Sequence, residues 1–269
     1  MRGRLSPVSE LYAPLRASMY DLLRRHFNGV DPARFDADLS EKNWAVLVED
    51  ERGDLAGFST ILIRRERWRG EPITVVHSGD TIVRPDAWGS SALPRTWIRS
   101  VRALRCAHGE GPLWWLLITS GFRTYRFLPV FCRSFVPRHD GAADAGLRGL
   151  ADALARRRFR DAYDPRAGVV RLPAPQVLRR GLDVIPDGRR GDPHVAFFER
   201  ANPGHVRGDE LVSLASLEDE NLTPSGLRML YGASARVLGS ARTDSAGEPV
   251  VSSGALNGAA GVPAGADEP

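Results

Sequence analysis

The stretch HSGDTIVRPDAWGSSALPRTW, residues 77–97, changes character along its length. It begins as a β-rich run, is interrupted by Gly79 and Asp80, resumes over residues 81–83, and then crosses a loop of small residues into a helical pattern. A glycine inside a strand often marks a β-bulge or a close approach to the backbone. The stretch therefore predicts a bulged strand that leads through a short loop into a helix.

Composition places this stretch in a globular protein. The chain has 269 residues, 42% of them hydrophobic, which is enough to bury a full core in one large or two small domains. The 37 basic residues include one lysine, Lys42, and they are mixed with 33 acidic residues, for a net charge of +4. This pattern favours a solvated surface, and no basic run with interleaved aromatics indicates nucleic-acid binding.

Two cysteines, Cys106 and Cys132, are too few for a disulfide framework and lack the spacing of a zinc site. No stretch approaches the roughly 18 apolar residues of a membrane span, and the first residues carry no apolar leader segment. We therefore expect a cytoplasmic protein with no membrane partner and no metal.

Periodicity before residue 77 predicts two helices and two strands. Apolar residues recur at helical spacing over 11–29, and Asp31 with Pro32 is typical of the start of a second helix. The runs 43–50 and 55–66 flank a polar turn and predict a hairpin, and a second turn leads into the strand 73–83. Three antiparallel strands are thus expected after two helices.

After the opening stretch, Trp97, Ile98, Val101 and Leu104 form one face of a helix. Residues 112–119 form a continuous apolar run, expected to be a strand covered on both faces, and 122–131 begin another short helix. The order α-α-β-β-β-α-β-α indicates a mixed sheet with helices on its faces.

The second half predicts a helix over 142–164, a loop over 171–193, a hairpin of strands 194–202 and 210–218, and a helix within 221–232. Composition suggests a disordered tail. The expected organisation is a flexible segment 1–10, a single domain 11–242 with an insertion around 140–193, and a disordered tail 243–269.

The order of elements, with TIVRPDAWGSSAL (81–93) and SGFRTYRFLP (120–129), resembles the GNAT acyltransferase superfamily over about residues 11–138. The resemblance implies an α/β (α+β) fold: a mixed, mostly antiparallel sheet with a splayed central strand pair and helices on both faces. In that family a bulge separates two central strands, and the opening receives an acyl thioester. Gly79 would be the bulge.

The resemblance also implies that acyl-CoA is the co-substrate and that the loop after the bulged strand holds its diphosphate. Trp88 stands where the family has Arg or Gln, Ser91 replaces a glycine and Leu93 a small residue, so the motif is degenerate. An acyl-carrier protein therefore stays open as the donor. The residues expected to bind the donor are Ile82, Val83, Trp88, Gly89, Ser90, Ser91 and Ala92.

Three residues are candidates for the chemistry. Asp80 can accept the proton of an attacking amine, or it can bind the backbone amides that a bulge leaves unpaired. Tyr125 stands where the resembling family places the acid for the leaving thiolate, or it packs in an aromatic cluster. Ser120 is a third candidate, in the region of the oxyanion.

We therefore expect an N-acyltransferase, bacterial and of specialised metabolism, that acts on the amine of a small molecule. A GNAT-shaped ligand-binding protein without activity is the alternative. A serine hydrolase that uses Ser91, Asp187 and His205 fits less well, because Leu93 replaces the last glycine of the nucleophile motif. The segment with His205, Asp209 and Glu210 is interpreted as a surface loop rather than a site.

Overall fold

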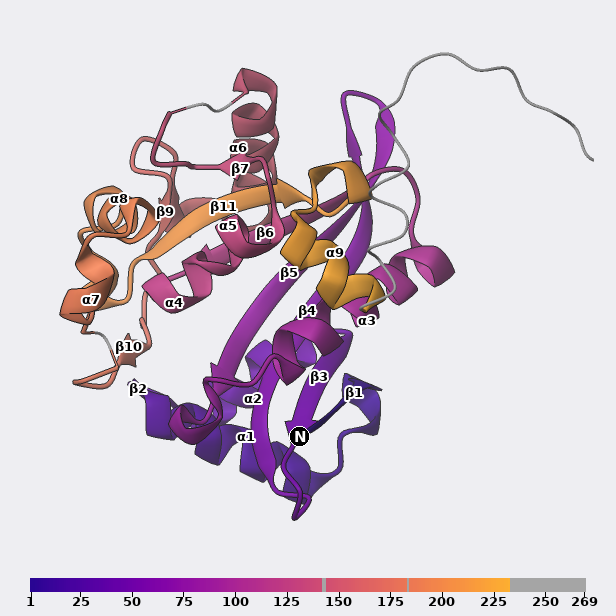
Figure 1. The fold of residues 1–269 in the computed structure, drawn as a ribbon, viewed down its shortest axis with the longest axis vertical. Helices are drawn as coiled ribbons and strands as arrows, with labels where there is room; N and C mark the ends of the chain where they lie inside the picture. The colour runs from indigo at the N-terminus through magenta and orange to yellow at the C-terminus, as the bar shows by residue number, and fades with distance from the viewer. Residues whose placement is uncertain (142–143, 183, 233–269) are drawn as a thin grey trace, which may run out of the picture. The chain divides into compact units, whose positions relative to one another are not determined.

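The computed structural model describes residues 1–141, 144–182 and 184–232, which belong to one compact unit (Figure 1). The expected tail 243–269 lies outside the described residues. The helices are α1 (Ala13–His26), α2 (Pro32–Ser40), α3 (Ala92–His108), α4 (Phe122–Tyr125), α5 (Phe127–Phe131), α6 (Ala145–Phe159), α7 (Asp187–Arg190), α8 (Pro193–Ala201) and α9 (Pro224–Tyr231). The strands are β1 (Arg2–Pro7), β2 (Phe27–Asn28), β3 (Trp44–Glu49), β4 (Leu55–Trp68), β5 (Glu71–Val83), β6 (Leu113–Thr119), β7 (Phe135–Val136), β8 (Tyr163–Asp164), β9 (Val169–Val170), β10 (Val177–Leu178) and β11 (Glu210–Ser216).

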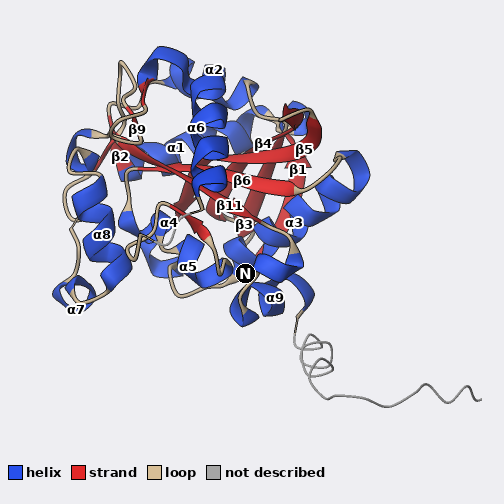
Figure 2. Cartoon of the chain, turned by 90° about the horizontal axis from the view of Figure 1, so that it is seen from above, coloured by secondary structure: helices blue, strands red, loops and turns tan. Residues whose placement is uncertain are grey.

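The main sheet has the strand order β1-β3-β4-β5-β6-β11-β9-β8, and β7 also pairs with β11. Within the described ranges, β5 and β6 run parallel and every other strand pairing is antiparallel. Helices cover both faces of the sheet (Figure 2). The fold is thus mixed α/β with a mostly antiparallel sheet, as predicted.

Alternation along the strands divides the core between the two faces. In β6, Leu113, Trp115 and Leu117 pack with α3, α4, α5, α8 and α9, and we call this side the α3 face. Leu116 packs on the other side of the sheet with α6, and we call this side the α6 face. On the same side, α1 and α2 form a separate apolar cluster over β3, β4 and β5. The prediction that the strand is covered on both faces is confirmed.

The predicted bulge lies in β5. Ser59 of β4 pairs with Thr81 and Ile61 pairs with Ser78, so Thr60 alone stands opposite both Gly79 and Asp80. On its other edge, β5 pairs with β6 from Thr74 to Ser78 and not beyond, although β6 continues to Thr119. The two central strands therefore separate at the bulge.

Residues 1–10 are not a flexible segment, which corrects the prediction. Arg2–Pro7 forms the edge strand β1, in antiparallel register with β3, and Arg4 makes an ion pair of 3.1 Å with Glu49. Leu5 packs against the core on the α3 face. The alternation of this short, mostly polar strand was too weak to detect in the sequence.

Residues 194–202 form helix α8 and not the predicted strand. The carboxylate of Asp192 accepts a hydrogen bond from the His194 amide, and Pro193 occupies the first helical turn. Val195 and Phe198, three residues apart, then bury one face of the helix. The strand predicted over 210–218 does form, as β11, but its neighbours are β6, β7 and β9.

Candidate functional site

The bulge decides where Asp80 points. Ser78 and Thr81 both line a cavity on the α3 face, although alternation alone would place them on opposite faces. The extra residue lies between them. Asp80 therefore lies on the α6 face, where the charged groups that act on it, Lys42 and Asp38, come from α2 and the residues that follow it.

Gly79 leaves room for the side chain of Lys42. A Cβ atom on Gly79 would lie 2.3 Å from Thr60 Oγ1 and 2.8 Å from Lys42 Cε, which is closer than such atoms approach. Lys42 crosses this space and donates from Nζ to the carbonyl of Asp38 at 3.0 Å. The glycine thus places the only lysine of the chain beside Asp80.

Burial raises the pKa of Asp80 to about 6, and Lys42 opposes the rise. Burial lowers the pKa of Lys42, which the carboxylate of Asp80 opposes in turn. Asp80 is therefore mainly ionised at pH 7 and retains a proton affinity well above that of an ordinary aspartate. This is the property that a general base requires.

A second carboxyl group lies near Asp80, and no sequence motif marked it as part of a site. Burial raises the pKa of Glu210 to about 8, and the carboxylate of Asp80 adds to the rise. Glu210 begins β11 and is partly buried, which corrects the interpretation of its segment as a surface loop. Of its neighbours, Asp209 pairs with Arg171 at 3.1 Å, and His205 contacts the ring of Phe198.

Ser120 lies next to Glu210. Leu211 of β11 pairs with Thr119 of β6, so Glu210 and Ser120 are the next residues in the same register. Ser120 is 8% exposed, and its hydroxyl has no hydrogen-bond partner among the residues that the structure describes. Ser120 and Glu210 thus occupy neighbouring positions at the ends of β6 and β11, and the carboxylate of Asp80 acts electrostatically on Glu210.

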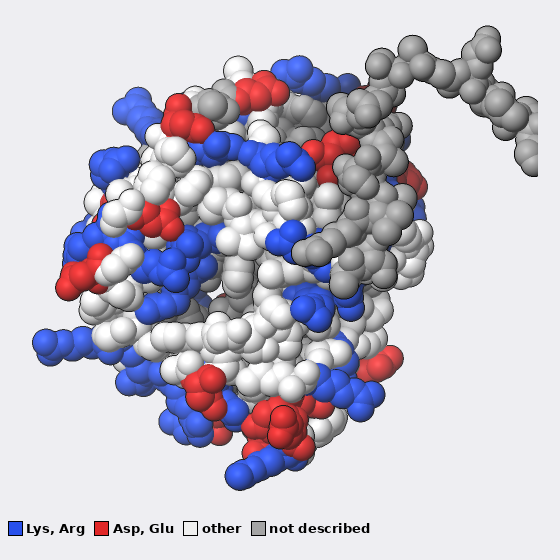
Figure 3. All heavy atoms as spheres, in the orientation of Figure 1, with Lys and Arg blue, Asp and Glu red and all other residues white. Residues whose placement is uncertain are grey.

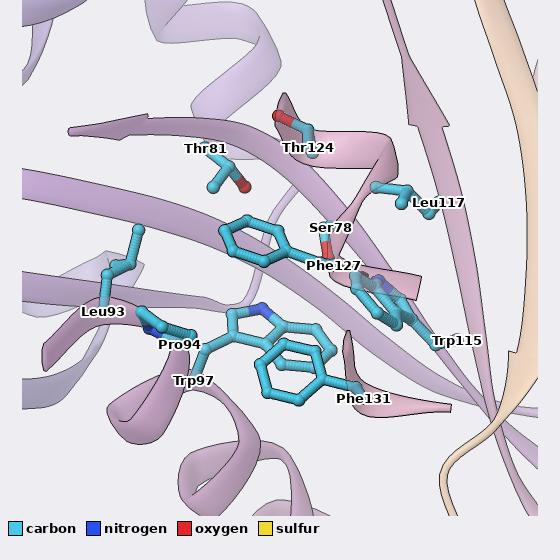
Figure 4. Close-up of a pocket in the computed structure, with 10 residues that line it drawn as sticks. All are labelled: Ser78, Thr81, Leu93, Pro94, Trp97, Trp115, Leu117, Thr124, Phe127 and Phe131. Carbon is cyan, nitrogen blue, oxygen red and sulfur yellow. Dashed lines mark hydrogen bonds between the residues drawn. The ribbon is translucent and has the colours of Figure 1, made fainter. Parts of the chain in front are cut away.

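A small cavity lies on the α3 face beside the bulge (Figure 4). Its volume of ≈ 20 Å³ is enough for about one water molecule. Trp115 donates from Nε1 to Ser78 Oγ at 2.8 Å, and its ring centroid lies 4.7 Å from that of Trp97. Entry of an acyl chain here requires side chains to move. The cavity is lined by Ser78, Thr81, Leu93, Pro94, Trp97, Trp115, Leu117, Thr124, Phe127 and Phe131.

Trp88 covers the free edge of β5. The amide of Arg84 donates to Ala56 of β4, so the carbonyl of Val83, on the same peptide unit, points away from β4 toward the opening. Trp88 Nε1 donates to this carbonyl at 2.8 Å, and the indole is 44% exposed. The guanidinium of Arg123 lies 4.5 Å from the Trp88 ring centroid and links the loop to α4.

The loop that follows offers amides at the start of α3. Ser90 N–H donates to the Ala87 carbonyl and Ala92 N–H to Ser90 Oγ, but the amides of Gly89, Ser91 and Leu93 have no acceptor within the described part of the chain. Unpaired amides at a helix N-terminus are suited to an anion. Ile82 is buried against the α1 and α2 cluster, so it can act here only through its backbone.

Tyr125 lies in the core and away from this opening. It is fully buried, its hydroxyl donates to the Pro137 carbonyl at 2.9 Å, and its ring stacks on Phe197 at 6.1 Å. Burial raises the pKa of the phenol above its ordinary value. The structure thus gives Tyr125 the packing role that was one of its two sequence interpretations.

The residues of the serine-hydrolase alternative are not assembled. Ser91 Oγ accepts a hydrogen bond from Arg95 at 3.2 Å, and Asp187 is fully exposed and pairs with Arg190. Among the described residues there is no group of three or more His, Cys, Asp or Glu arranged to hold a metal ion. Over the same residues, no helix is long and apolar enough to cross a bilayer.

A central strand pair that separates at a bulge, next to a loop that ends at a helix N-terminus, is the arrangement that the GNAT resemblance implied. Three solved structures similar to part of the chain carry related descriptions. A probable N-acyltransferase from Enterococcus faecalis has 15% identity and a TM-score of 0.37, over 50% of this chain and 33% of its own. A GNAT family N-acetyltransferase from Escherichia coli in complex with CoA has 16% identity and a TM-score of 0.35, over 47% and 68%. Glucosamine-6-phosphate N-acetyltransferase from Arabidopsis thaliana has 15% identity and a TM-score of 0.32, over 43% and 82%.

No protein-family model matches the sequence, and no curated protein matches it. The matched region spans a third of the Enterococcus faecalis protein. At 15–16% identity and these TM-scores, the similarity does not establish an activity, a donor or an acceptor for this chain.

Proposed function

We propose that the protein is an N-acyltransferase that moves an acyl group from a thioester to the amine of a small molecule. The observation that supports this most is the bulge at Gly79, because β5 leaves β6 there and a carboxyl group of raised pKa stands at the opening. Acyl transfer to an amine needs a base, since an ammonium ion cannot attack a carbonyl carbon.

Acyl-CoA is the proposed donor, and the residues present fit its charged end. The free amides of Gly89, Ser91 and Leu93 would hold the diphosphate at the start of α3. The donor supplies an activated acyl carbon. In the view of Figure 3, basic side chains lie on either side of a hollow near the centre of the molecule, which suits a polyanionic donor or an acidic carrier protein.

In the proposed step, Asp80 takes a proton from the acceptor's ammonium group. The amine nitrogen forms a bond to the thioester carbonyl carbon and loses its second proton to solvent, and the carbon–sulfur bond breaks. The thiolate leaves and takes a proton from solvent, because the Tyr125 hydroxyl is bonded to Pro137 in the core. Lys42 keeps Asp80 ionised before the acceptor arrives.

A second candidate is a ligand-binding protein without acyl transfer. It is favoured by the hydrogen bond between Trp88 and Val83, which occupies the strand edge at the opening, and by the small volume of the adjacent cavity. Both features make the opening narrow as it stands.

Thermal unfolding with CoA, acetyl-CoA, longer acyl-CoA species and an acylated phosphopantetheine tests donor binding, because a ligand of the folded state alone raises the melting temperature. Mass spectrometry of mixtures with primary amines then tests transfer. We expect a rise in melting temperature and an acylated amine that the Asp80→Asn protein does not form. A rise in melting temperature without an acylated product would favour the ligand-binding protein. If neither the rise nor the product is observed, both candidates are overturned.

A further inference from the structure

We infer that Glu210 is the acceptor-recognition residue of the site: Asp80 and Glu210 hold the ammonium group between them, and Glu210 releases a proton to solvent as the ammonium binds. This inference rests on the proposed function for the fate of the bound amine. Its physical basis is a juxtaposition of two carboxyls and a free hydroxyl, at the ends of three strands that come from distant parts of the sequence.

The first step is the geometry of the three strand ends. The extra residue of the bulge in β5 reverses the order in which side chains alternate between the two faces, so Asp80 lies on the α6 face. Glu210 precedes Leu211, which pairs with Thr119, so its backbone lies beside that of Ser120 at the end of β6. Since β6 has no partner on its β5 side beyond Leu117, this edge is open to a ligand.

The second step is the unpaired hydroxyl. Ser120 is more than nine-tenths buried, and in the described ranges its hydroxyl neither donates nor accepts a hydrogen bond. The hydroxyl oxygen is not fully enclosed, so a ligand can reach it and exchange a hydrogen bond with it in place of water. In β6, Leu116 and Ile118 face the α6 side, and Ser120 is the next residue in this alternation. In β11, Val212 and Leu214 face the same side, and Glu210 precedes them in the same alternation. The two side chains are therefore expected on the same face of the sheet, at neighbouring register positions.

The third step is the charge balance. The groups that act on the two carboxyls are Asp38, Arg34 and Lys42 of α2 and its end. Arg158 of α6 and His77 of β5 also face Lys42, and burial holds the pKa of His77 at about 3, so this imidazole is neutral.

Lys42 donates to the carbonyl of Asp38, and no ion pair joins it to Asp80 within 4.0 Å in the described structure. Asp80 is thus left with one negative charge and Glu210 with a proton at pH 7. An ammonium ion that binds between them would favour the ionised form of Glu210. Binding and proton release are therefore linked.

The test measures binding of n-butylammonium chloride, a primary ammonium that stays charged to pH 9, by isothermal titration calorimetry without any acyl donor. For the wild type, the dissociation constant should fall by about tenfold between pH 7 and pH 9, as Glu210 ionises. For Glu210→Gln it should change by less than about twofold, because the amide cannot ionise. n-Butanol is the control ligand, because it has the same chain without the charge. Glu51→Gln is the control protein, because it removes an exposed carboxyl away from the site.

A second readout guards against simple loss of folding. The melting temperature of Glu210→Gln, relative to wild type, should rise between pH 5 and pH 9, since ionising a buried carboxyl destabilises only the wild type. A constant difference would indicate a packing role and overturn the inference, as would equal pH dependence of butylammonium binding in both proteins. If the amine binds with this pH dependence but no acyl group is transferred, the inference about Glu210 stands and the proposed function is overturned. If an acyl group is transferred but amine binding lacks this pH dependence, the proposed function stands and the inference about Glu210 is overturned.

Discussion

The indole Nε1 of Trp88 donates a hydrogen bond of 2.8 Å to the carbonyl of Val83, at the point where β5 has lost its partner β6. Trp88, which stands where the resembling family has Arg or Gln, thus bonds the edge of the opening instead of facing an anion. The same indole stacks with Arg123, whose Nη1 donates to the Leu182 carbonyl at 2.7 Å. Trp88 and Arg123 together connect the loop before α3 to α4.

Trp88→Phe tests whether this contact competes with the donor. Phenylalanine keeps a ring for Arg123 to stack on but removes the N–H, which leaves the Val83 carbonyl with only its 3.1 Å contact to His26 Nε2. We expect acetyl-CoA to bind about 3- to 10-fold more tightly, the worth of one net hydrogen bond, as measured by isothermal titration calorimetry. Trp88→Ala serves as the control that also removes the stack. Unchanged affinity in Trp88→Phe would show that the hydrogen bond does not obstruct the donor.

Asp80→Asn tests the base. The amide preserves the shape of the side chain but cannot take a proton, so we expect turnover to fall by roughly 10²- to 10⁴-fold with little change in donor affinity. In the wild type, kcat/KM should rise as the pH passes about 6, where Asp80 loses its proton. A folded Asp80→Asn protein with full turnover would contradict the assignment.

The stability of Asp80→Asn should depend on pH in a stated direction. The folded pKa of Asp80 is about 6, above the ordinary value of 3.8, so the native state binds the extra proton in this window. The stability associated with this group is fully present below pH 3.8 and is lost as the pH rises through 6. The melting temperature of Asp80→Asn relative to wild type should therefore increase from pH 4 to pH 7. A decrease would indicate that the ionised carboxylate instead stabilises the bulge.

Gly79→Ala should destabilise the fold. The added methyl group would meet Thr60 Oγ1 at 2.3 Å, and Thr60 is buried, so the strand or the threonine must shift. Overpacking of this kind costs about 1–3 kcal/mol, measurable by chemical denaturation. Gly89→Ala is the control, because nothing lies within 4 Å of a Cβ at that position. Equal stability of the two variants would rule out the tight approach at the bulge.

Tyr125→Phe separates packing from proton donation. Losing the hydrogen bond to Pro137 should lower the free energy of unfolding by about 1 kcal/mol, because the partly buried carbonyl loses its donor. Turnover per folded molecule should stay within about twofold of wild type, since the hydroxyl does not reach the opening. A large loss of turnover in a well-folded protein would restore Tyr125 as an acid.

Local patterns in the sequence determined most of the fold around the site. Neighbouring residues carry three of these patterns: the helical spacing, the cap at Asp31 and the glycine at position 79. They correctly predicted α1, α2, the strands β3, β4 and β5, and the bulge. Two errors also arose locally. Segment 2–7 was too short and polar to be recognised as a strand, and the apolar run at 194–202 fits a helix once the Asp192 cap is considered.

Only the tertiary structure decided which charges meet. Asp80 and Glu210 are separated by 129 intervening residues, and their proximity depends on β11 pairing with β6 while β5 turns away. A pKa likewise depends on burial and on charges from other segments, which no local pattern records. The sequence thus determined the carboxylate of Asp80 and the glycine that redirects it. Packing decided that the charges of Lys42 and Glu210 interact with it and that the Tyr125 hydroxyl instead bonds Pro137 in the core.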